Sequence, residues 1–467
     1  MSIIIPANSA AGGGYEVSNS LRFNSGSSDY LNRTLGTPTL ATKNTLSIWF
    51  KKAKLGADQS MILGNGNQGG INLHNDDGVV FYNAGGSLRT NRKLRDTSAW
   101  YNLVVVTDTT LNTATDRLKM YINGVQETSF SSSGNPSQNA ASNLGSATAH
   151  NIGVNNSPAN YFNGYMSEFV FIDGTALDPT SFGEFDEDSS IWKPKNVSGL
   201  TFGTNGFYLK FGNSGALGTD SSGEGNTFAV NNLTAIDQST DTCTNNFATM
   251  NPLDNYWQGS AFSEGSLTVT TTNASQSYNT SSIMVSSGKW YVECKPVSGG
   301  SEPEIGIFSK LTGANAGNNS QLSYNANGYA YRASDPGSVW YNGSAVSTSF
   351  SQYANGDIVG IALDLDNNKL YFSKNGTFGN SGNPTSGSTG TGAISIVAPT
   401  STTLGAYGFA ANESFNDQNK VFSWNFGSPP YAISSGNTDG NDHGNFEYAV
   451  PSGYLALCTK NLSEVDS

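Results

Sequence analysis

The chain has few charged residues, few histidines and few cysteines, and each shortage excludes a class of protein. Only 13% of its 467 residues are charged and no heptads recur, so a coiled coil is excluded. Three cysteines, Cys243, Cys294 and Cys458, do not make a disulfide framework. No run approaches about 18 apolar residues, so we expect no insertion into a membrane. The start of the chain lacks the basic flank of a secretion signal, which predicts synthesis in a cytoplasm.

The charge that is present is mainly acidic and lies in the second half. Residues 214–467 hold 8 basic and 20 acidic side chains, whereas residues 1–213 hold 15 and 16. Because an acidic surface repels phosphate backbones, we expect no nucleic-acid partner. One basic cluster, residues 89–95, precedes Trp100. We interpret it as a solvated connection between strands, with a docking patch for an acidic glycan or a partner protein as the alternative.

Short runs of alternating or β-branched residues, bounded by Gly, Asn, Asp and Ser, recur along the whole chain. Many short strands separated by turns are typical of a sandwich or jelly roll. The runs include Leu46–Phe50, Val79–Tyr82, Tyr101–Thr107, Leu118–Ile122, Phe169–Ile172, Trp290–Cys294, Ile305–Phe308, Ile358–Leu365, Lys369–Ser373 and Phe422–Phe426. Trp49, Trp100, Trp290 and Trp424 lie in such apolar runs and are expected in the core.

Turn and cap signals refine this pattern. Asn123-Gly124 and Asn375-Gly376 each close a strand-like run, where a left-handed turn favours Asn and Gly. The best short helix is Asp178–Phe182, with Asp178 as N-cap and Pro179 at the first helical position. The predicted fold class is therefore all-β.

Composition divides the chain into two β-sandwich domains in tandem. The predicted boundaries are a first domain over 1–213, a polar linker over 214–252, a second domain over 253–460 and a C-terminal tail over 461–467. The linker is rich in Ser, Gly, Thr, Asn and Asp and almost lacks apolar periodicity. Gly379–Gly392 is similarly polar and is expected to be an exposed loop.

Three blocks in the first domain resemble the laminin-G/concanavalin-like jelly roll. They are Ala99–Asp108, Asp116–Gly124 and Phe162–Asp173, which carry a Trp followed by a hydrophobic run, an Asn-Gly hairpin and an F-x-G-x-hydrophobic-x-E strand. They occur in the family's order. The resemblance implies a two-sheet jelly roll.

Four blocks in the second half resemble a SPRY domain. Gly288–Cys294 and Glu304–Phe308 are similar to its early strands, and Gly356–Asp366 with Lys369–Gly376 is similar to its central hairpin. That family is also a β-sandwich, and the resemblance implies that variable loops hold a partner.

The combination resembles predicted virion proteins of tailed bacteriophages, notably marine ones. The opening over Gly14–Asn24 and Ser28–Asn32, and the closing Phe182–Asp188 with Ile191–Pro194, carry this resemblance. It implies a structural or adhesive part of a phage particle, made in the host cytoplasm. Residues 1–12 are expected to be an arm that pairs with a neighbour's sheet or a frayed terminus.

Catalytic patterns find little support, and we assign no catalytic residue. Gly64–Gly69 matches G-x-G-x-x-G, but strand-like rather than helical residues follow it, so a glycine-rich turn is expected. Glu184, Asp186 and Asp188 resemble the E-x-D-x-E core of jelly-roll glycoside hydrolases, in which paired carboxylates cleave a glycosidic bond. The alternative is an acidic surface loop, because the segment follows a short helix and precedes two serines.

No metal ligand is assigned either. His74, His150 and His443 are far apart and have no partner motif, so neither a zinc site nor a catalytic triad is predicted. The jelly-roll resemblance makes calcium possible, and the candidate loops are Asn75–Asp77 and Asp364–Asn368, although the second also reads as a hairpin turn. No other cofactor is expected.

The candidate binding residues are aromatics beside a predicted turn. Tyr331, Arg332, Asp335, Trp340 and Tyr341 flank Pro336; the rings could stack on sugars while Arg332 and Asp335 bind hydroxyls. The alternative is that Tyr331 and Trp340 alternate as core residues of a hairpin.

The expected function is attachment of a phage to its host, as a tail fibre or adhesin that binds a surface glycan or protein noncovalently through loops on rigid sheets. One alternative is a head fibre or decoration protein, and a second is a polysaccharide depolymerase. Other virion proteins are expected partners, and we expect a homo-oligomer, for which the trimers common among phage fibres offer one form.

Overall fold

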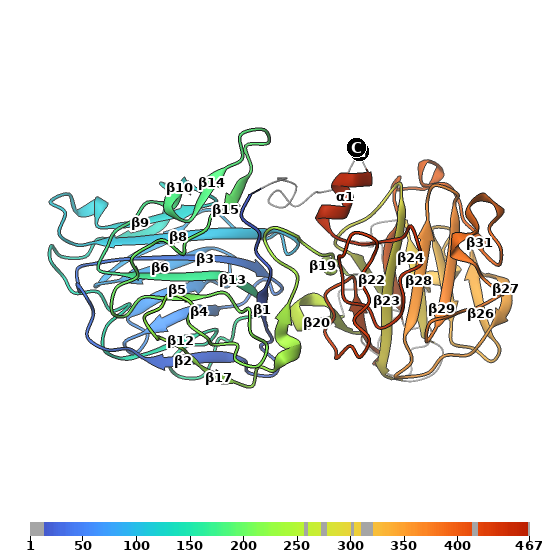
Figure 1. The fold of residues 1–467 in the computed structure, drawn as a ribbon, viewed down its shortest axis with the longest axis horizontal. Helices are drawn as coiled ribbons and strands as arrows, with labels where there is room; N and C mark the ends of the chain where they lie inside the picture. Colours follow the sequence, from blue (N-terminus) through green and yellow to red (C-terminus); the bar gives the residue numbers. More distant parts are fainter. Residues whose placement is uncertain are drawn as a thin grey trace. The chain divides into compact units, whose positions relative to one another are not determined.

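The computed structural model describes residues 14–255, 260–271, 278–299, 303–309, 321–412 and 419–465 (Figure 1). These residues fall into two compact units that divide between Asn246 and Phe247, called here the N-terminal unit and the C-terminal unit. Each unit is built from two packed β-sheets, so the predicted all-β fold is confirmed. The expected arm over residues 1–12 lies outside the described residues.

Two eight-stranded antiparallel sheets form the N-terminal unit. The first runs in the order β10 (Val125–Gln126), β9 (Leu118–Ile122), β8 (Trp100–Asp108), β3 (Lys43–Lys52), β13 (Gly164–Asp173), β1 (Ser20–Phe23) and β18 (Gln238–Ser239), with β16 (Phe207–Leu209) paired to β13. The second runs β11 (Phe130–Gly134), β7 (Gly86–Thr90), β6 (Val79–Asn83), β5 (Gly69–Leu73), β4 (Gln59–Gly64), β12 (Ala149–Ile152), β2 (Tyr30–Thr34) and β17 (Ala229–Asn231). Leu46, Ile48 and Phe81 belong to the apolar core between them.

The interval predicted as a polar linker, 214–252, is instead largely part of the N-terminal unit. Within it, β17 pairs with β2 and β18 pairs with β1. Its polar side chains satisfy buried groups of the first sheet: the Lys51 ammonium lies 2.8 Å from the Asp241 carboxylate, and the Trp100 indole donates to Asp241 at 3.0 Å. Polar composition was therefore a misleading guide, because the polar residues around Asp241 pair in the interior, while others of the interval remain exposed.

Two more sheets form the C-terminal unit. The first runs β19 (Met250–Asn255), β22 (Tyr278–Ser281), β32 (Gly408–Asn412), β24 (Glu304–Phe308), β25 (Gly328–Arg332), β26 (Gly337–Tyr341) and β27 (Ser344–Phe350). The second runs β20 (Ala261–Ser263), β21 (Thr268–Thr270), β33 (Val421–Asn425), β23 (Lys289–Ser298), β28 (Val359–Asp364), β29 (Lys369–Lys374) and β30 (Thr377–Phe378), with β31 (Ile394–Ser395) on β29 and β34 (Leu455–Ala456) on β23.

The four tryptophans expected in the core are buried. Trp49 and Trp100 lie in the N-terminal unit, Trp290 and Trp424 lie in the C-terminal unit, and none is more than 1% exposed. Fully buried indoles contribute strongly to packing, so these positions anchor both sandwiches.

Helical structure in the described residues is short, and it corrects one prediction. The 3-10 turns are η1 (Ala114–Asp116), η2 (Pro179–Ser181), η3 (Ala235–Asp237), η5 (Glu264–Ser266), η6 (Leu322–Tyr324), η7 (Pro384–Thr389) and η8 (Pro399–Ser401). In η2 the Asp178 carboxylate accepts the Thr180 amide at 2.9 Å, which confirms the predicted cap. The predicted tail over 461–467 instead contributes to α1 (Thr459–Val465), because Leu462 and Val465 pack against the core. The loop predicted at Gly379–Gly392 contains one short helical segment, η7.

The two Asn-Gly turns form as expected. Asn123 and Gly124 have φ of 49° and 77°, and Asn375 and Gly376 have φ of 48° and 78°. These left-handed pairs match the twist of the flanking strands and close the β9–β10 and β29–β30 hairpins.

Candidate binding site

The hairpin β25–β26 carries four of the five predicted binding residues, and strand alternation sends them to two faces of the sheet. Arg332 and Trp340 point outward, whereas Tyr331 and Tyr341 point into the sandwich and contact its core. Asp335 is exposed in the turn that joins the strands. The structure thus brings Arg332 and Trp340 together and separates both from the two tyrosines.

The outward pair is completed by a residue that the sequence did not single out. Tyr324, at the end of η6, stacks on Trp340 with ring centroids 6.0 Å apart and an interplanar angle of 18°. The Arg332 guanidinium lies 4.9 Å from the Trp340 ring centroid and 5.8 Å from that of Tyr324. We call these three residues the aromatic platform. Tyr324 is 49% exposed, Trp340 is half-buried and Arg332 is buried, so solvent reaches the platform at its rings.

Buried polar groups hold the platform in place. Glu304, which is fully buried on β24, forms an ion pair with the Arg332 Nε at 3.2 Å, and it also accepts the Ser323 hydroxyl at 2.6 Å. A second guanidinium nitrogen donates to the Gln321 side chain at 2.8 Å. The Trp340 indole donates to the Ser338 hydroxyl at 2.8 Å. These hydrogen bonds and the ion pair present the rings on a fixed support.

The inward tyrosines, Tyr331 and Tyr341, pack as core residues. For Tyr331 this agrees with the alternative prediction of a core residue in a hairpin. Tyr341 stacks on Tyr329 with centroids 4.3 Å apart, and Tyr331 meets Tyr353 at 4.8 Å in an edge-to-face contact. Burial raises the pKa of Tyr331 above 10, and its hydroxyl donates to the Ser351 carbonyl. Neither ring is placed to stack on a ligand beside Trp340.

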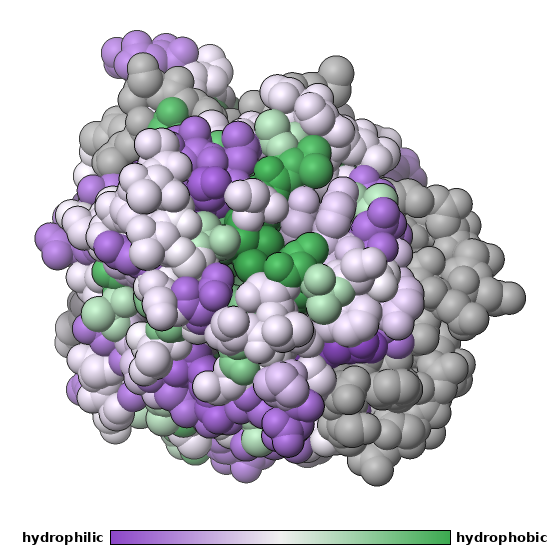
Figure 2. All heavy atoms as spheres, turned by 90° about the vertical axis from the view of Figure 1, so that its right-hand side faces the viewer, coloured by the Kyte–Doolittle hydropathy of each residue, from purple (hydrophilic) through white to green (hydrophobic). Residues whose placement is uncertain are grey.

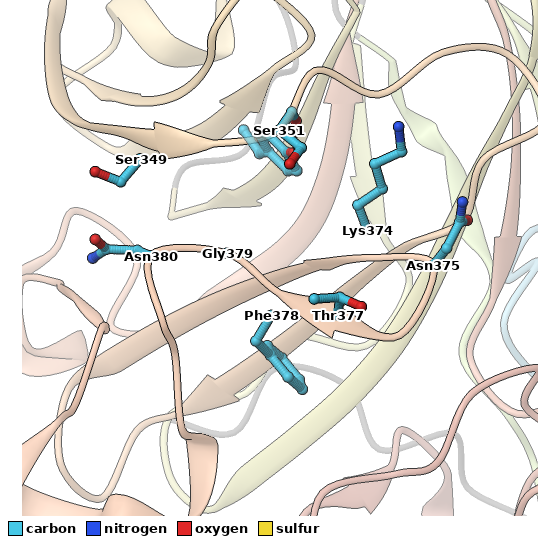
Figure 3. Close-up of a pocket in the computed structure, with 9 residues that line it drawn as sticks. Ser349, Ser351, Lys374, Asn375, Thr377, Phe378, Gly379 and Asn380 are labelled. Carbon is cyan, nitrogen blue, oxygen red and sulfur yellow. Dashed lines mark hydrogen bonds between the residues drawn. The ribbon is translucent and has the colours of Figure 1, made fainter.

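A pocket of about 510 Å³ opens between the end of β27 and the β29–β30 hairpin (Figure 3). Its lining is mostly polar and comes from both sheets: Tyr331, Ser349, Ser351, Lys374, Asn375, Thr377, Phe378, Gly379 and Asn380. Figure 3 shows the two serines on one side and the hairpin residues on the other. In Figure 2, which faces the side of the C-terminal unit where β27 lies, apolar side chains gather near the middle of a largely polar surface.

Sequence reasoning missed Tyr324 and nearly all of the pocket for the same reason. Tyr324 precedes Trp340 by a strand and a turn, and Ser349 precedes Asn380 by a strand and a hairpin, so no local motif links either pair. The one available signal was Gly379–Gly392, because glycine allows close backbone approach. A β-carbon on Gly379 would lie 2.2 Å from the Phe350 ring.

The carboxylates that resemble a hydrolase motif do not share one strand face. Glu184 lies on β14 (Gly183–Phe185), which pairs with β15 (Trp192–Pro194), and its carboxylate is 3.8 Å from the Lys193 ammonium. Asp186 instead caps the following turn: hydrogen bonds from the Ser189 amide and hydroxyl lower its pKa to about 2. Asp188 lies in that turn. The segment therefore has the geometry of an ion-paired turn.

The first candidate calcium loop is occupied by cations of the chain itself. The Lys93 ammonium lies 2.5 Å from the Asp76 carboxylate and, with Arg89, lowers the pKa of Asp76. Asp77 is paired with the Lys52 ammonium at 2.9 Å. The positive charge of residues 89–95 is thus largely neutralised within the N-terminal unit. This neutralisation supports the interpretation of the basic cluster as a connection between strands.

Within the described ranges, no group of three or more His, Cys, Asp or Glu residues could hold a metal ion. In the same part of the chain, no helix has the length and hydropathy needed to cross a bilayer. Gly64 and Gly69 end β4 and begin β5, so the G-x-G-x-x-G sequence forms a hairpin turn, as expected.

Comparisons with known proteins bear on the fold. Residues 25–180 match the family model described as the Concanavalin A-like lectin/glucanases superfamily. The chain matches no curated protein. Among solved structures it is similar to the SPRY domain of human HERC1, with 14% identity, coverage of 38% of this chain and 96% of that domain, and a TM-score of 0.29.

Two further solved structures are similar to the chain. One is a candidate carbohydrate-binding protein from Bacteroides ovatus, with 14% identity, coverage of 46% of this chain and 59% of that one, and a TM-score of 0.34. The other is stonustoxin, with 14% identity, coverage of 38% and 27%, and a TM-score of 0.27. The family match and the observed sheets together confirm the predicted fold class, a chain of β-sandwich units of which the first is similar to the concanavalin-like jelly roll.

Proposed function

We propose that this protein binds carbohydrate noncovalently and that it attaches a bacteriophage particle to a glycan on its host. The observation that carries the binding proposal is the aromatic platform of Tyr324, Arg332 and Trp340. Its Tyr324 ring is exposed and its Trp340 ring is half-buried, while Glu304 and Arg332 beneath them are buried and ion-paired. The faces of aromatic rings carry partial negative charge, which suits the C–H groups on the flat face of a sugar.

Charge supports a ligand that is not strongly anionic. The Arg332 guanidinium lies 4.9 Å from the Trp340 ring centroid, and its charge is compensated by Glu304 at 3.2 Å. The second half of the chain holds 20 acidic and 8 basic residues, which disfavours a polyanion. The proposed ligand is therefore a neutral segment of a surface glycan, held by stacking and by hydrogen bonds from loop residues.

The proposed place on a virion rests on the sequence resemblance of residues 14–32 and 182–194 to phage virion proteins. In this proposal the other virion proteins are assembly partners, the protein is a homo-oligomer, and it acts without hydrolysing the glycan. The alternative is a head fibre or decoration protein, which would occupy another position on the particle.

The platform is tested by retention on an array of bacterial surface polysaccharides. Trp340→Ala and Tyr324→Ala should each reduce retention about fivefold or more, because a lost ring contact is worth roughly 1 kcal/mol or more. Phe185→Ala is the matched control, because Phe185 is 50% exposed and lies in the other unit. Unchanged retention of both platform variants, or no retention of the unmodified protein on any polysaccharide, would refute the proposal.

The place on the particle needs a separate experiment. An antibody against residues 253–458 should label the tail of intact particles in electron micrographs and block adsorption to the host. Label over the head with normal adsorption would replace the adhesin by a structural protein. Absence of label from every particle would contradict the virion assignment.

A further inference from the structure

The C-terminal unit contains a second candidate site, the pocket between β27 and the β29–β30 hairpin. We propose that this pocket binds a single neutral sugar residue, such as the end of a glycan chain. The inference deepens the proposed carbohydrate binding and rests on it, but it concerns different side chains. Its volume of about 510 Å³ lies within the roughly 300–1,000 Å³ typical of small-molecule sites.

The two walls of the pocket are tied to each other. The Asn380 amide donates to the Ser349 carbonyl at 2.9 Å, and the Lys374 ammonium donates to the Gln352 carbonyl at 2.8 Å. Each bond joins the segment at the end of β27 to the β29–β30 hairpin. From the inner side, the Tyr331 hydroxyl donates to the Ser351 carbonyl. The pocket is thus preformed, which lowers the entropic cost of holding a small ligand.

Several polar groups in these walls have capacity left for a ligand. The hydroxyls of Ser349, Ser351 and Thr377 form no hydrogen bond to any other residue in the part of the chain that the structure describes. The Lys374 ammonium has three N–H donors, of which Gln352 and Asp357 take two. Hydroxyls that both donate and accept, beside one ammonium donor, match the hydroxyls of a sugar.

Charge selects a neutral sugar over an acidic one. Lys374 is the cation of the pocket, and the Asp357 carboxylate lies 3.2 Å from its ammonium. The Asn375 side chain also donates to Asp357, at 2.7 Å, which holds that carboxylate beside the pocket. An anionic ligand would have to compete with Asp357 for the ammonium, whereas a neutral hydroxyl needs only the unused donor.

Backbone conformation shapes the hairpin wall. Asn380 and Ser381 have φ of 54° and 53°, a left-handed conformation that costs roughly 1 kcal/mol or more for a residue other than glycine. Next to them, Gly379 lies so close to Phe350 that no side chain would fit. Two consecutive strained residues beside a glycine in close contact are typical of backbone held in place for a site.

The test is an NMR titration of the full chain with the methyl glycosides of glucose, galactose, mannose and N-acetylglucosamine, with methyl glucuronide as the anionic probe. At least one neutral glycoside should bind saturably, in the millimolar range expected for so small a ligand. Thr377→Trp, which fills the pocket, and Lys374→Met should each weaken binding at least tenfold. Thr348→Trp is the matched control, because Thr348 is also exposed but lies outside the pocket.

Three results would overturn the inference: no saturable shift with any neutral glycoside, unchanged binding by Thr377→Trp, or tighter binding of the glucuronide. Loss of binding in Thr348→Trp as well would also count against it, since the effect would then not be specific to the pocket. Polysaccharide retention that depends on Trp340 would be unaffected by such failures. The two proposals can therefore fail separately.

Discussion

Tyr331 and Arg332 are consecutive residues of β25, and their side chains serve opposite faces of one sheet. Tyr331 contacts Tyr353 in the core and reaches the pocket with its hydroxyl end, while Arg332 lies 4.9 Å from the Trp340 ring centroid on the outer face. One strand therefore supports both candidate sites. A change that shifts β25 should affect the platform and the pocket together.

Glu304→Gln should destabilise the platform. The substitution keeps the shape of the side chain but removes the carboxylate charge that lies 3.2 Å from the buried Arg332 guanidinium. Removing one partner of a buried ion pair costs about 3–5 kcal/mol. Hydrogen exchange of the β24 and β25 amides should accelerate accordingly, and polysaccharide retention should fall. Glu187→Gln, on an exposed turn, is the control; equal protection in both variants would contradict the role given to Glu304.

Stability of the N-terminal unit should depend on Glu168. Burial raises the pKa of this carboxyl to about 6 from 4.5, against the effect of the Tyr208 hydroxyl, which donates to it. A raised pKa means that the protonated form stabilises the fold. This contribution is full below about pH 4.5 and is lost as the pH rises through about 6.

Between pH 4.5 and 7.5 this loss amounts to about 2 kcal/mol. Glu168→Gln cannot ionise, so hydrogen exchange of the β13 amides in that variant should vary less with pH, once intrinsic exchange rates are removed. If the unmodified protein and the variant showed the same pH dependence, Glu168 would not titrate as inferred.

Asp241→Asn should loosen the segment that carries β18. The Lys51 ammonium would keep the Asn246 amide oxygen, 2.7 Å away, but would lose the charge of the Asp241 carboxylate that now lies 2.8 Å from it. We expect a loss of about 3 kcal/mol or more and faster proteolysis within residues 238–246. The double variant Lys51→Met/Asp241→Asn buries no charge and should recover part of the loss. A double variant no more stable than the single one would argue against the ion pair as the cause.

Gly379→Ala should distort the hairpin wall of the pocket. Its added methyl would lie 2.2 Å from the Phe350 ring, and such overpacking costs about 1–3 kcal/mol. Gly440→Ala provides the control in the same unit, because nothing lies within 4 Å of the added carbon there. The difference should appear in the thermal unfolding of the full chain and in the affinity for methyl glycosides.

Much of the fold could be predicted from the sequence, because its signals are local. Alternation predicts the strands around Trp290 and Trp424, and an aspartate before a proline predicts the cap at Asp178. The five candidate binding residues were also located to one hairpin. Which face each would occupy depends on register against β24 and β27, and a one-residue shift reverses it. The sequence of the hairpin alone does not determine how it pairs with β24 and β27.

The remaining features depend on contacts distant in sequence. Tyr324 reaches Trp340 because η6 lies against β25 and β26, and the pocket exists because β27 and the β29–β30 hairpin border each other. The polar stretch around Asp241 resembled a linker because composition cannot distinguish polar groups in water from those paired in the interior. Contacts between distant segments therefore determine the Tyr324–Trp340 stack, the pocket and the burial of the segment around Asp241.

The burial of Asp241 against Lys51 also determines where the protein can be divided. A fragment that ends at residue 213, the boundary suggested by composition, would lack β17 and β18 and would remove the carboxylate and the amide that contact the Lys51 ammonium. A fragment that ends at Asn246 retains both strands, the carboxylate and the amide that contact Lys51. Expression of the two units as separate polypeptides should therefore begin from a cut between Asn246 and Phe247.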